Sequence, residues 1–402
     1  MLYFMVRGKG RKWMRHSDKE SAYVLEGKNT NCTKDMPDPQ DTNITLTIAY
    51  LCPNETHPER ADNFFATAQF VTGVIIYPIL CFPGIVGNIL TLIVLYHKDM
   101  ATSTSVYLSA LALSDLIKLL NDLMYFIVIL IVRIDPVKGE ITMSELYPYT
   151  HYIFNVAVCI TAWLTVSIAV ERYISVCHPA KAKDLCTIPR ARAVSVSVFV
   201  VMTILTIPSA LRYEAVKIHD SLTNRSCFEI RPSDFGRNQS FMVPYIWIQN
   251  SLRSIVPLVV LIFLNARIIN EVKRERVKGK SLSGKTRITI MLVIVIIVFL
   301  VCITPDAVMS MFFGFGYIEE TSDIKGIREI TDSLLALNSA FNFVLYCSMS
   351  QQFRGTFYKI FCAKCQDLKR QKRNTGIENG RPCVVKVIIN NNQQRGLQET
   401  YV

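Results

Sequence analysis

Seven long apolar stretches divide this 402-residue chain, and they constrain its fold more than any other feature. Each is about twenty residues or longer, the length at which an α-helix crosses roughly 30 Å of hydrocarbon. The predicted spans are residues 70–96, 103–132, 147–176, 193–212, 241–270, 286–316 and 327–349. The last span carries Asp332, Asn338 and Asn342, so we expect a strict hydropathy window to miss it. The sequence therefore predicts an all-α membrane protein, built as a seven-transmembrane helix bundle.

Two signals place the N-terminus on the extracellular side. Five Asn-X-Ser/Thr sequons lie in the N-terminal tail or between spans four and five, at Asn31, Asn43, Asn54, Asn224 and Asn238. Basic residues crowd the segment between spans five and six, as the positive-inside rule expects of a cytoplasmic loop. They are Lys273, Arg274, Arg276, Lys278, Lys280 and Lys285. Because the number of spans is odd, the C-terminus is expected inside the cell.

Four segments follow from this layout: a glycosylated extracellular tail (1–68), the bundle (69–350), an inner-face helix (351–365) and a disordered cytoplasmic tail (366–402). The inner-face helix is expected to be amphipathic, because Phe353, Phe357, Ile360 and Phe361 form one apolar stripe. The last segment is rich in Lys, Arg, Asn and Gln, a composition typical of disorder. Residues 7–19 are basic and follow no secretory apolar region. We therefore expect the first span to act as a signal anchor. A start site assigned too far upstream is the alternative explanation of this basic stretch.

Several features of the chain indicate partners at the inner face. Cys362 and Cys365 suit S-palmitoylation, with two unmodified surface thiols as the alternative. Thr400 and Val402 match the C-terminal peptides that PDZ domains capture. The net charge of +12 comes from basic residues at membrane flanks, which favours lipid and a cytoplasmic protein over nucleic acid.

The sequence contains none of the motifs expected of an enzyme. It has no P-loop, no nucleophile–base motif and no metal-ligand cluster, and its twelve cysteines form neither a close-spaced disulfide scaffold nor a zinc pattern. Cys32, Cys52 and Cys227 fall in segments predicted to be extracellular, where they can oxidise. We expect neither an enzymatic activity nor a cofactor, apart from an ion discussed below.

A set of ordered motifs makes the chain resemble the rhodopsin-like (class A) G-protein-coupled receptors over residues 70–362. They are Gly87-Asn88, Leu111 to Asp115, Glu171-Arg172-Tyr173, Pro257, Pro305, Asn342 and Tyr346. Within that family, the chain more closely resembles orphan receptors that respond to aromatic amino acids and invertebrate neuropeptide (FMRFamide-type) receptors. That closer resemblance rests on Trp163 to Val166, Phe263 to Asn265, Ser283 to Thr286 and Asn342 to Cys347.

The chain departs from the family pattern at several places. Tyr147 stands near the usual Cys at the top of span three, so Cys227 pairs with Cys32 or Cys52, or stays free. Ile303 replaces the Trp two residues before the span-six proline, and Phe299 is expected to take over part of its role. Lys285 stands where many relatives have an acid, which leaves Glu171 as the main resting partner of Arg172.

The resemblance implies two functional groups inside the bundle. The G-protein coupling switch would consist of Glu171, Arg172 and Tyr173, with Asn342 and Tyr346. A second group would contain Asp115, Asn88, Thr161, Asn338 and Asn342. Oxygen ligands suit a hard cation, so the resemblance implies an allosteric sodium ion at Asp115, and a hydrogen-bonded polar core is the alternative.

The ligand pocket is expected to open outward between spans two, three, five, six and seven. Its candidate residues are Tyr125, His151, Phe154, Asn155, Gln249, Asn250, Arg253, Asp306, Ser310, Arg328 and Asp332. Arg253 and Asp306 lie deep in apolar sequence, so they should pair with each other or with a ligand. Lys118 and Asp122 are one helical turn apart and are expected to pair.

The sequence thus predicts a multi-pass plasma-membrane receptor for an extracellular ligand, for which we favour a neuropeptide. Its intracellular partner would be a heterotrimeric G protein of the Gq or Gi type. The alternatives are a receptor for a small aromatic amino acid or metabolite, and a membrane transporter. A transporter would also hold charges in mid-membrane, but it should contain internal repeats and broken helices, which the sequence lacks.

Overall fold

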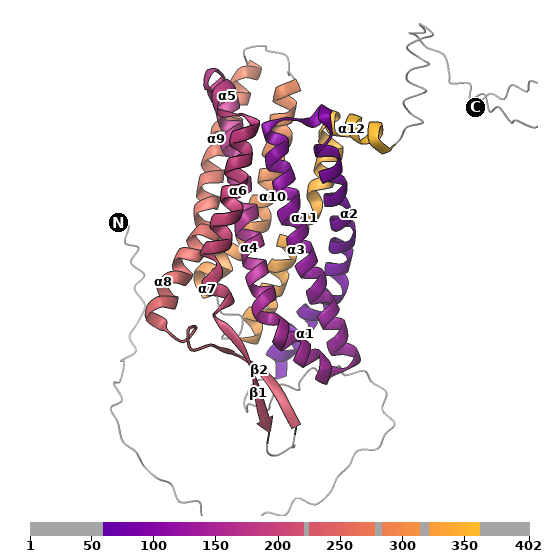
Figure 1. Ribbon diagram of the computed structural model, residues 1–402, viewed down its shortest axis with the longest axis vertical. Coiled ribbons are helices and arrows are strands. Elements are labelled where there is room, and N and C mark those ends of the chain that lie inside the picture. Colours follow the sequence, from indigo (N-terminus) through magenta and orange to yellow (C-terminus); the bar gives the residue numbers. More distant parts are fainter. Residues whose placement is uncertain (1–58, 221–224, 278–283, 314–320, 362–402) are drawn as a thin grey trace, which may run out of the picture. The chain divides into compact units, whose positions relative to one another are not determined.

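The computed structural model describes residues 59–220, 225–277, 284–313 and 321–361. Within these ranges, the backbone alone is described at residues 59–63, 218–220, 225–229, 275–277, 284–288 and 313. Long helices that run side by side account for most of the described chain (Figure 1). The predicted bundle architecture is confirmed.

The membrane-crossing helices follow the predicted order. The first span is a continuous helical run of α1 (Glu59–Phe70), η1 (Val71–Ile76) and α2 (Tyr77–Leu95). The second, third and fourth are α3 (Ser103–Ile134), α4 (Pro136–Cys177) and α6 (Ile188–Leu205). The fifth combines α8 (Gln239–Asn250), η3 (Ser251–Ile255) and α9 (Val256–Val277), and α10 (Gly284–Phe313) and α11 (Ser322–Met349) complete the bundle.

Only five of these runs are apolar enough to span a membrane by length and hydropathy within the described residues. They are Phe64–Leu95, Pro136–Cys177, Ile188–Leu205, Gln239–Arg274 and Thr289–Phe312. The absence of α11 from this set agrees with the expectation from its sequence. The absence of α3 does not follow from a lack of apolar residues, because this helix is apolar on average but carries Asp115, Lys118 and Asp122 near its middle.

Two helices begin earlier than the apolar runs from which the first and third spans are predicted. The first helix starts at Glu59, inside the segment predicted as tail (1–68). The third span starts at Pro136 rather than residue 147. Asp135 separates it from α3 and caps its first turn, since its side chain accepts a hydrogen bond from the Lys138 backbone N–H at 3.1 Å. An acidic N-cap followed by proline is a strong helix start, so little loop remains between spans two and three.

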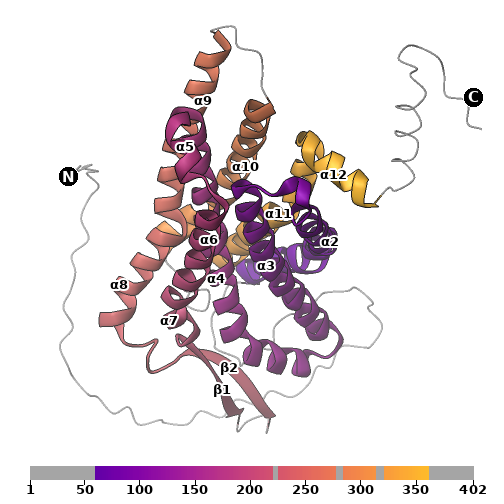
Figure 2. The same ribbon diagram turned by 45° about the horizontal axis from the view of Figure 1, so that its top comes forward.

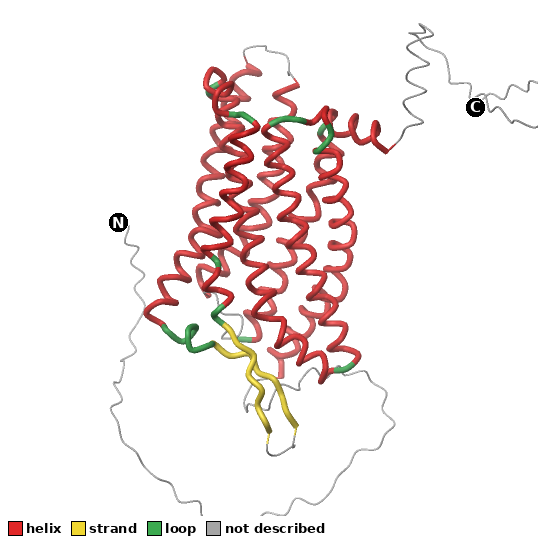
Figure 3. Tube along the Cα trace, viewed as in Figure 1, coloured by secondary structure: helices red, strands yellow, loops and turns green. Residues whose placement is uncertain are grey.

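A β-hairpin that the sequence reading missed connects spans four and five (Figure 3). Strands β1 (Tyr213–Asp220) and β2 (Arg225–Pro232) pair antiparallel, with Tyr213 opposite Pro232 and Ala215 opposite Ile230. The overlooked signal is the alternation of apolar and polar residues from Val216 to His219, in a segment interpreted only as a polar loop. The membrane-spanning part remains entirely helical.

Short elements cover the two ends of the bundle. The end with α12 (Gln351–Phe361) also carries η2 (Lys98–Met100) and α5 (Pro179–Leu185), whereas α7 (Ile207–Ala210) leads into the hairpin. Figures 1 and 2 both place the hairpin and α12 at opposite ends. The predicted amphipathic helix is present, because Phe353 is buried and packs against Tyr346, with ring centroids 5.7 Å apart.

Close approach of α2 to α11 depends on glycine. A Cβ atom added at Gly84 would lie 2.8 Å from the Ala340 Cβ atom, and one added at Gly87 would lie 2.9 Å from the Phe343 Cβ atom. Real carbon atoms do not approach so closely, so these positions set the separation of the first and seventh spans. This contact holds Asn88, one residue after Gly87, near the centre of the bundle.

Two π-helical segments interrupt the regular helices. The π register displaces backbone carbonyls from their usual intrahelical partners, and such segments often mark functional sites. In η3 the Leu252 carbonyl accepts a hydrogen bond from the indole Nε1–H of Trp163 at 2.9 Å, which ties this segment to α4. The same segment carries Arg253, and η1 carries Thr72, both of which contact buried carboxylates.

Candidate functional site

An ion pair between Arg253 and Asp306 lies in the half of the bundle that carries the hairpin. Arg253 Nη2 and Asp306 Oδ2 are 2.8 Å apart, and the side chains are only 2% and 1% exposed. Arg253 Nη1 also donates to Asn155 Oδ1 at 3.0 Å, so η3, α10 and α4 are joined at one point. The predicted pairing is therefore present, and the two charges satisfy each other in this structure. Removing either member of so deeply buried an ion pair should destabilise the fold, because the other charge is then left buried without a counter-charge.

A second ion pair faces the first across an aromatic ring. Lys118 Nζ lies 2.6 Å from both carboxylate oxygens of Asp122, as predicted from their spacing. The Phe154 ring centroid is 4.7 Å from Lys118 Nζ and 5.1 Å from Arg253 Cζ, so two cations approach one ring. Such contacts are favourable because the π-face of the ring is electron-rich. Asp332 lies within electrostatic reach of both cations.

Glu329 is a buried carboxylate that the sequence reading did not select. Its Oε1 atom accepts a hydrogen bond from the Tyr125 hydroxyl at 2.7 Å, and its Oε2 atom accepts one from Thr72 at 3.2 Å. Gln69 Nε2 donates to the Tyr125 oxygen at 3.1 Å. Tyr125, a predicted pocket residue, thus belongs to a network that joins the first, second and seventh spans. Glu329 stands near the start of its span, where a charge is usually interfacial, so only its burial marks it.

Aromatic rings dock the hairpin onto α4. The ring centroid of Tyr213, the first residue of β1, lies 5.5 Å from that of Tyr147 and 5.4 Å from that of His151. Tyr147 stands near the place where the family has its cysteine, so ring packing occupies that position here. The Arg212 guanidinium lies 5.0 Å from the Tyr213 ring centroid. His151, predicted to contact the ligand, has this anchoring contact as well.

Further buried polar atoms lie on spans five and six, in the same half of the bundle as the Arg253–Asp306 pair. Asn250 Nδ2 donates to the Ser310 carbonyl at 3.3 Å. Within the described part of the chain, Gln249 Nε2, Asn250 Oδ1 and Ser310 Oγ have no hydrogen-bond partner. Buried polar atoms are nearly always hydrogen-bonded, so these three atoms are available to a bound polar group. The last predicted pocket residue, Arg328, is buried at the adjacent end of α11.

Asp115 forms the centre of a polar group at mid-membrane. Its Oδ2 atom accepts a hydrogen bond from Asn342 Nδ2 at 2.7 Å, and the hydroxyls of Thr161 and Ser339 lie beside the same carboxylate. Asn88 Nδ2 donates to the Ser339 carbonyl at 2.9 Å. These contacts bring α2, α3, α4 and α11 together around one carboxylate, and Asn338 is buried on α11 as well.

The Glu171–Arg172 pair lies at the end of the bundle that carries α12. Glu171 Oε2 and Arg172 Nη2 are 3.3 Å apart. Ser103 Oγ donates to Glu171, and Arg172 Nη2 donates to Thr104 Oγ1 at 2.7 Å. The start of α3 therefore holds both members of the pair. Sequence reasoning missed these hydroxyls, because Ser and Thr at a helix start are ordinarily capping residues.

The predicted coupling switch is divided in the structure. Tyr173 packs against His178, with ring centroids 5.4 Å apart, at the end of α4. Asn342 binds Asp115 instead of Arg172, so it belongs to the mid-membrane group. Tyr346 packs against Phe353 of α12. Asn342 is predicted for both groups, and its contact in this structure is with Asp115 of the mid-membrane group.

The predicted modification sites and the predicted PDZ-binding residues fall almost entirely outside the described residues. The modification sites are Asn31, Asn43, Asn54, Asn224, Cys362 and Cys365, the PDZ-binding residues are Thr400 and Val402, and all remain predictions. The Lys285 side chain also lies outside the described side chains. Asn238, the remaining sequon, is exposed at the start of α8.

Comparison with known proteins identifies neuropeptide receptors that are similar in sequence to this chain. The chain is 26% identical over 356 residues to the FMRFamide receptor of Drosophila melanogaster, which covers 81% of this chain and 58% of that receptor. It is 27% identical over 330 residues to the Drosophila melanogaster sex peptide receptor, with 75% of each chain covered. It is 26% identical over 378 residues to neuromedin-U receptor 1 of Homo sapiens, covering 83% of this chain and 81% of that receptor.

A family model described as "7 transmembrane receptor (rhodopsin family)" matches residues 87–346. The match begins at Gly87 and ends at Tyr346, so it contains the buried ion pairs, the Asp115 group and the Glu171–Arg172 pair. The matched region is more than half of the 402 residues. The chain therefore belongs to the rhodopsin family of seven-transmembrane, G-protein-coupled receptors.

Proposed function

We propose that this chain is a plasma-membrane receptor that binds an extracellular peptide at its hairpin end and activates a heterotrimeric G protein at the opposite end. The observation that carries the proposal is the Glu171–Arg172 pair, held by two hydroxyls of α3 at the α12 end of the bundle. An arginine held this way is a two-state element, since a partner that binds its guanidinium must first displace these contacts.

Relatives support a peptide over a small aromatic metabolite as the ligand. Three of them are named as receptors for FMRFamide, sex peptide and neuromedin U. The free polar atoms of Gln249, Asn250 and Ser310 suit the amide groups of a peptide backbone. Arg328 and Asp332 add charges of both signs at the same end. A peptide with a charged side chain matches such a pocket better than a neutral ring does.

The ligand acts by shifting a population of conformations. It must bind the active arrangement more tightly than the resting one, because a ligand with equal affinity for both shifts nothing. Trp163 and Asn155 of α4 both contact η3, which carries Arg253. A ligand that moves η3 therefore acts on α4, the same helix that carries Arg172 at its other end. This connection gives a physical route from ligand to G protein.

The direct test is a ligand screen in cells that express the full chain. Amidated and free neuropeptides are compared with aromatic amino acids, using calcium and cyclic AMP readouts to separate Gq-type from Gi-type coupling. A peptide response that is absent from untransfected cells supports the proposal. A response to aromatic amino acids alone would overturn the choice of ligand, and substrate flux in vesicles without any G-protein response would favour a transporter.

Glu171→Ala is expected to raise basal signalling. The substitution removes both the partner of Arg172 and the acceptor of Ser103, and a charge-assisted hydrogen bond contributes about 1.5–3 kcal/mol. Basal nucleotide exchange should rise about tenfold or more at equal surface expression. Asp184→Ala, an exposed acid near the same end, is the control. Basal exchange no higher than that of wild type would refute this role of Glu171.

We also propose that Asp115 binds a sodium ion that favours the resting state. Asp115 Oδ1 and Asn88 Oδ1 are buried and accept no hydrogen bond of good geometry from the described residues. The residues therefore fit the ion, because a carboxylate and an amide oxygen are the ligands that a hard cation prefers. Asp115, Asn88 and Thr161 would hold it, and the ion would supply positive charge beside the carboxylate.

Asp115→Asn is expected to remove the sodium dependence of agonist affinity. In wild type, replacing sodium chloride with N-methylglucamine chloride should raise agonist affinity, since the ion no longer favours the resting state. The variant should bind agonist equally in both salts. A variant that keeps the full sodium effect would leave the hydrogen-bonded polar core as the explanation of these residues.

A further inference from the structure

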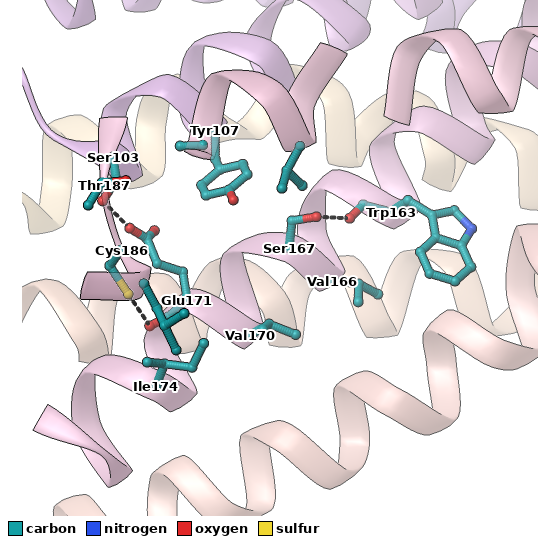
Figure 4. Close-up of a pocket in the computed structure, with 13 residues that line it drawn as sticks. Ser103, Tyr107, Trp163, Val166, Ser167, Val170, Glu171, Ile174, Cys186 and Thr187 are labelled. Atoms are coloured by element: carbon teal, nitrogen blue, oxygen red, sulfur yellow. Dashed lines mark hydrogen bonds between the residues drawn. The ribbon is translucent and has the colours of Figure 1, made fainter. Parts of the chain in front are cut away.

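A cavity of about 230 Å³ lies between α3, α4 and α6, close to the Glu171–Arg172 pair (Figure 4). Ser103 and Tyr107 of α3 form one side, and Val170 and Glu171 of α4 form another. Val194 of α6 lines it as well. The cavity is larger than the 150 Å³ that accommodates benzene in an engineered protein core, so a small organic group can enter it.

The walls of this cavity are polar at one end and apolar elsewhere. Figure 4 shows the Glu171 carboxylate beside Ser103 and Thr187, whereas Val166, Val170 and Ile174 belong to the mainly apolar remainder of the wall. Ser167 also lines that part, but its hydroxyl donates to the Trp163 carbonyl at 2.8 Å. Glu171 is 4% exposed, and its Oε2 atom forms no hydrogen bond of good geometry within the described residues, although Arg172 Nη2 is 3.3 Å away. One acceptor site on a buried carboxylate is therefore available.

The mouth of the cavity lies on the outer surface of the bundle. Val170 is 38% exposed and Val194 is 40% exposed, on neighbouring helices that both cross the membrane. Apolar side chains on such a surface face hydrocarbon. A ligand therefore enters from the lipid, which selects an amphiphile, and the acidic end selects a head group that donates hydrogen bonds or carries positive charge.

We propose that this cavity binds a cationic, membrane-partitioned amphiphile whose head group binds Glu171 and whose first methylenes lie against Val166 and Val170. The head group competes with Arg172 for one carboxylate. Occupancy therefore loosens the resting pair and raises basal nucleotide exchange. This effect rests on the proposed function of Glu171, whereas the binding itself does not.

Cys186 provides a readout of binding that needs no G protein. It lines the cavity, and its Sγ atom lies 3.9 Å from the Glu171 carbonyl oxygen. Receptor in lipid nanodiscs is labelled with N-ethylmaleimide, and mass spectrometry measures the rate at which Cys186 is labelled. Cys177 does not line the cavity, so its labelling rate is the internal reference. Dodecylamine, dodecanol and dodecanoate are compared as ligands, because they share the same twelve-carbon chain and differ only in the head group.

Dodecylamine is expected to slow labelling of Cys186 about tenfold more than dodecanoate does, because only the cation is attracted to the carboxylate. Labelling of Cys177 should not change. Glu171→Gln should abolish the preference for the amine while leaving room for the tail. Val194→Phe, which fills the mouth, should abolish protection by all three. Val196→Phe should not, because this exposed residue lies on a different face of α6 and does not line the cavity.

Three results would overturn the proposal in whole or in part. Equal protection by amine and dodecanoate, or protection that survives Val194→Phe, would show that the cavity is not the binding site. Selective protection without a rise in basal exchange, in a preparation where Glu171→Ala does raise it, would refute competition with Arg172. If Glu171→Ala and every agonist fail to raise exchange, the proposed coupling role fails, and the labelling experiment still tests the site.

Discussion

Arg253→Gln is expected to reduce the stability of the folded receptor by about 3–5 kcal/mol, because it leaves the Asp306 carboxylate buried without a counter-charge. Asp306→Asn should also be destabilising, because it leaves the Arg253 guanidinium buried without a counter-charge. The double variant should recover most of the loss, since two neutral amides can hydrogen-bond in the same place. Thermal unfolding of purified receptor, followed by reaction of a thiol dye with the buried Cys159 and Cys302, measures all three.

The matched control is an ion pair of the same kind on the surface. Lys138 Nζ and Asp135 Oδ2 are 2.9 Å apart, but their side chains are 77% and 37% exposed. Lys138→Gln should therefore change stability by no more than about 1 kcal/mol. Equal losses for Lys138→Gln and Arg253→Gln would contradict the importance of burial.

Agonist potency separates a structural role of this pair from direct ligand contact. If the pair only fixes helix packing, Arg253→Gln and Asp306→Asn should lower potency to the same extent at equal surface expression. A loss for Asp306→Asn that Arg253→Gln does not share would indicate that the ligand binds the carboxylate. We expect the shared loss, because the two groups already bind each other at 2.8 Å.

Arg172→Ala is expected to abolish G-protein activation while the receptor still reaches the cell surface. The side chain is 11% exposed, and its guanidinium contacts Glu171 and Thr104. Ser103 still donates to the Glu171 carboxylate after the substitution, so this acid keeps a hydrogen-bond partner. Loss of two charge-assisted contacts with a partner corresponds to about a hundredfold loss in agonist-stimulated exchange.

Nucleotide exchange on a panel of purified G proteins measures the Arg172→Ala effect, with surface receptor quantified by antibody. Arg190→Ala is the control, because Arg190 is exposed near the same end and donates to the Asp184 carbonyl. Normal exchange by Arg172→Ala at normal surface expression would contradict the central role of this residue.

The bundle could be predicted because membrane helices follow from local composition. Twenty or more apolar residues leave few options in a bilayer, where backbone polar groups must be satisfied within the segment. The early starts of α1 and α4 could not be read in this way, since Glu59 and Pro136 precede the apolar runs. The hairpin was missed because a two-stranded element outside the membrane needs no long apolar pattern.

The ion pairs differed in how readily the sequence indicated them. Lys118 and Asp122 are one helical turn apart, so their contact is a local property. Arg253 and Asp306 were paired because charges inside apolar spans need partners and few candidates exist. Thr104 contacts a residue 68 positions away, and its hydroxyl has many ordinary uses in a helix, so only the tertiary structure identifies it as a partner of Arg172.

The docking of the hairpin also affects how the receptor can be handled. Tyr213 is held on α4 by contacts with the rings of Tyr147 and His151, and a thiol reductant does not break such contacts. Dithiothreitol should therefore leave this end of the hairpin in place, and cell-free synthesis under reducing conditions should yield receptor whose β1 begins in its native position. A family member that depends on a cystine there would lose that anchor.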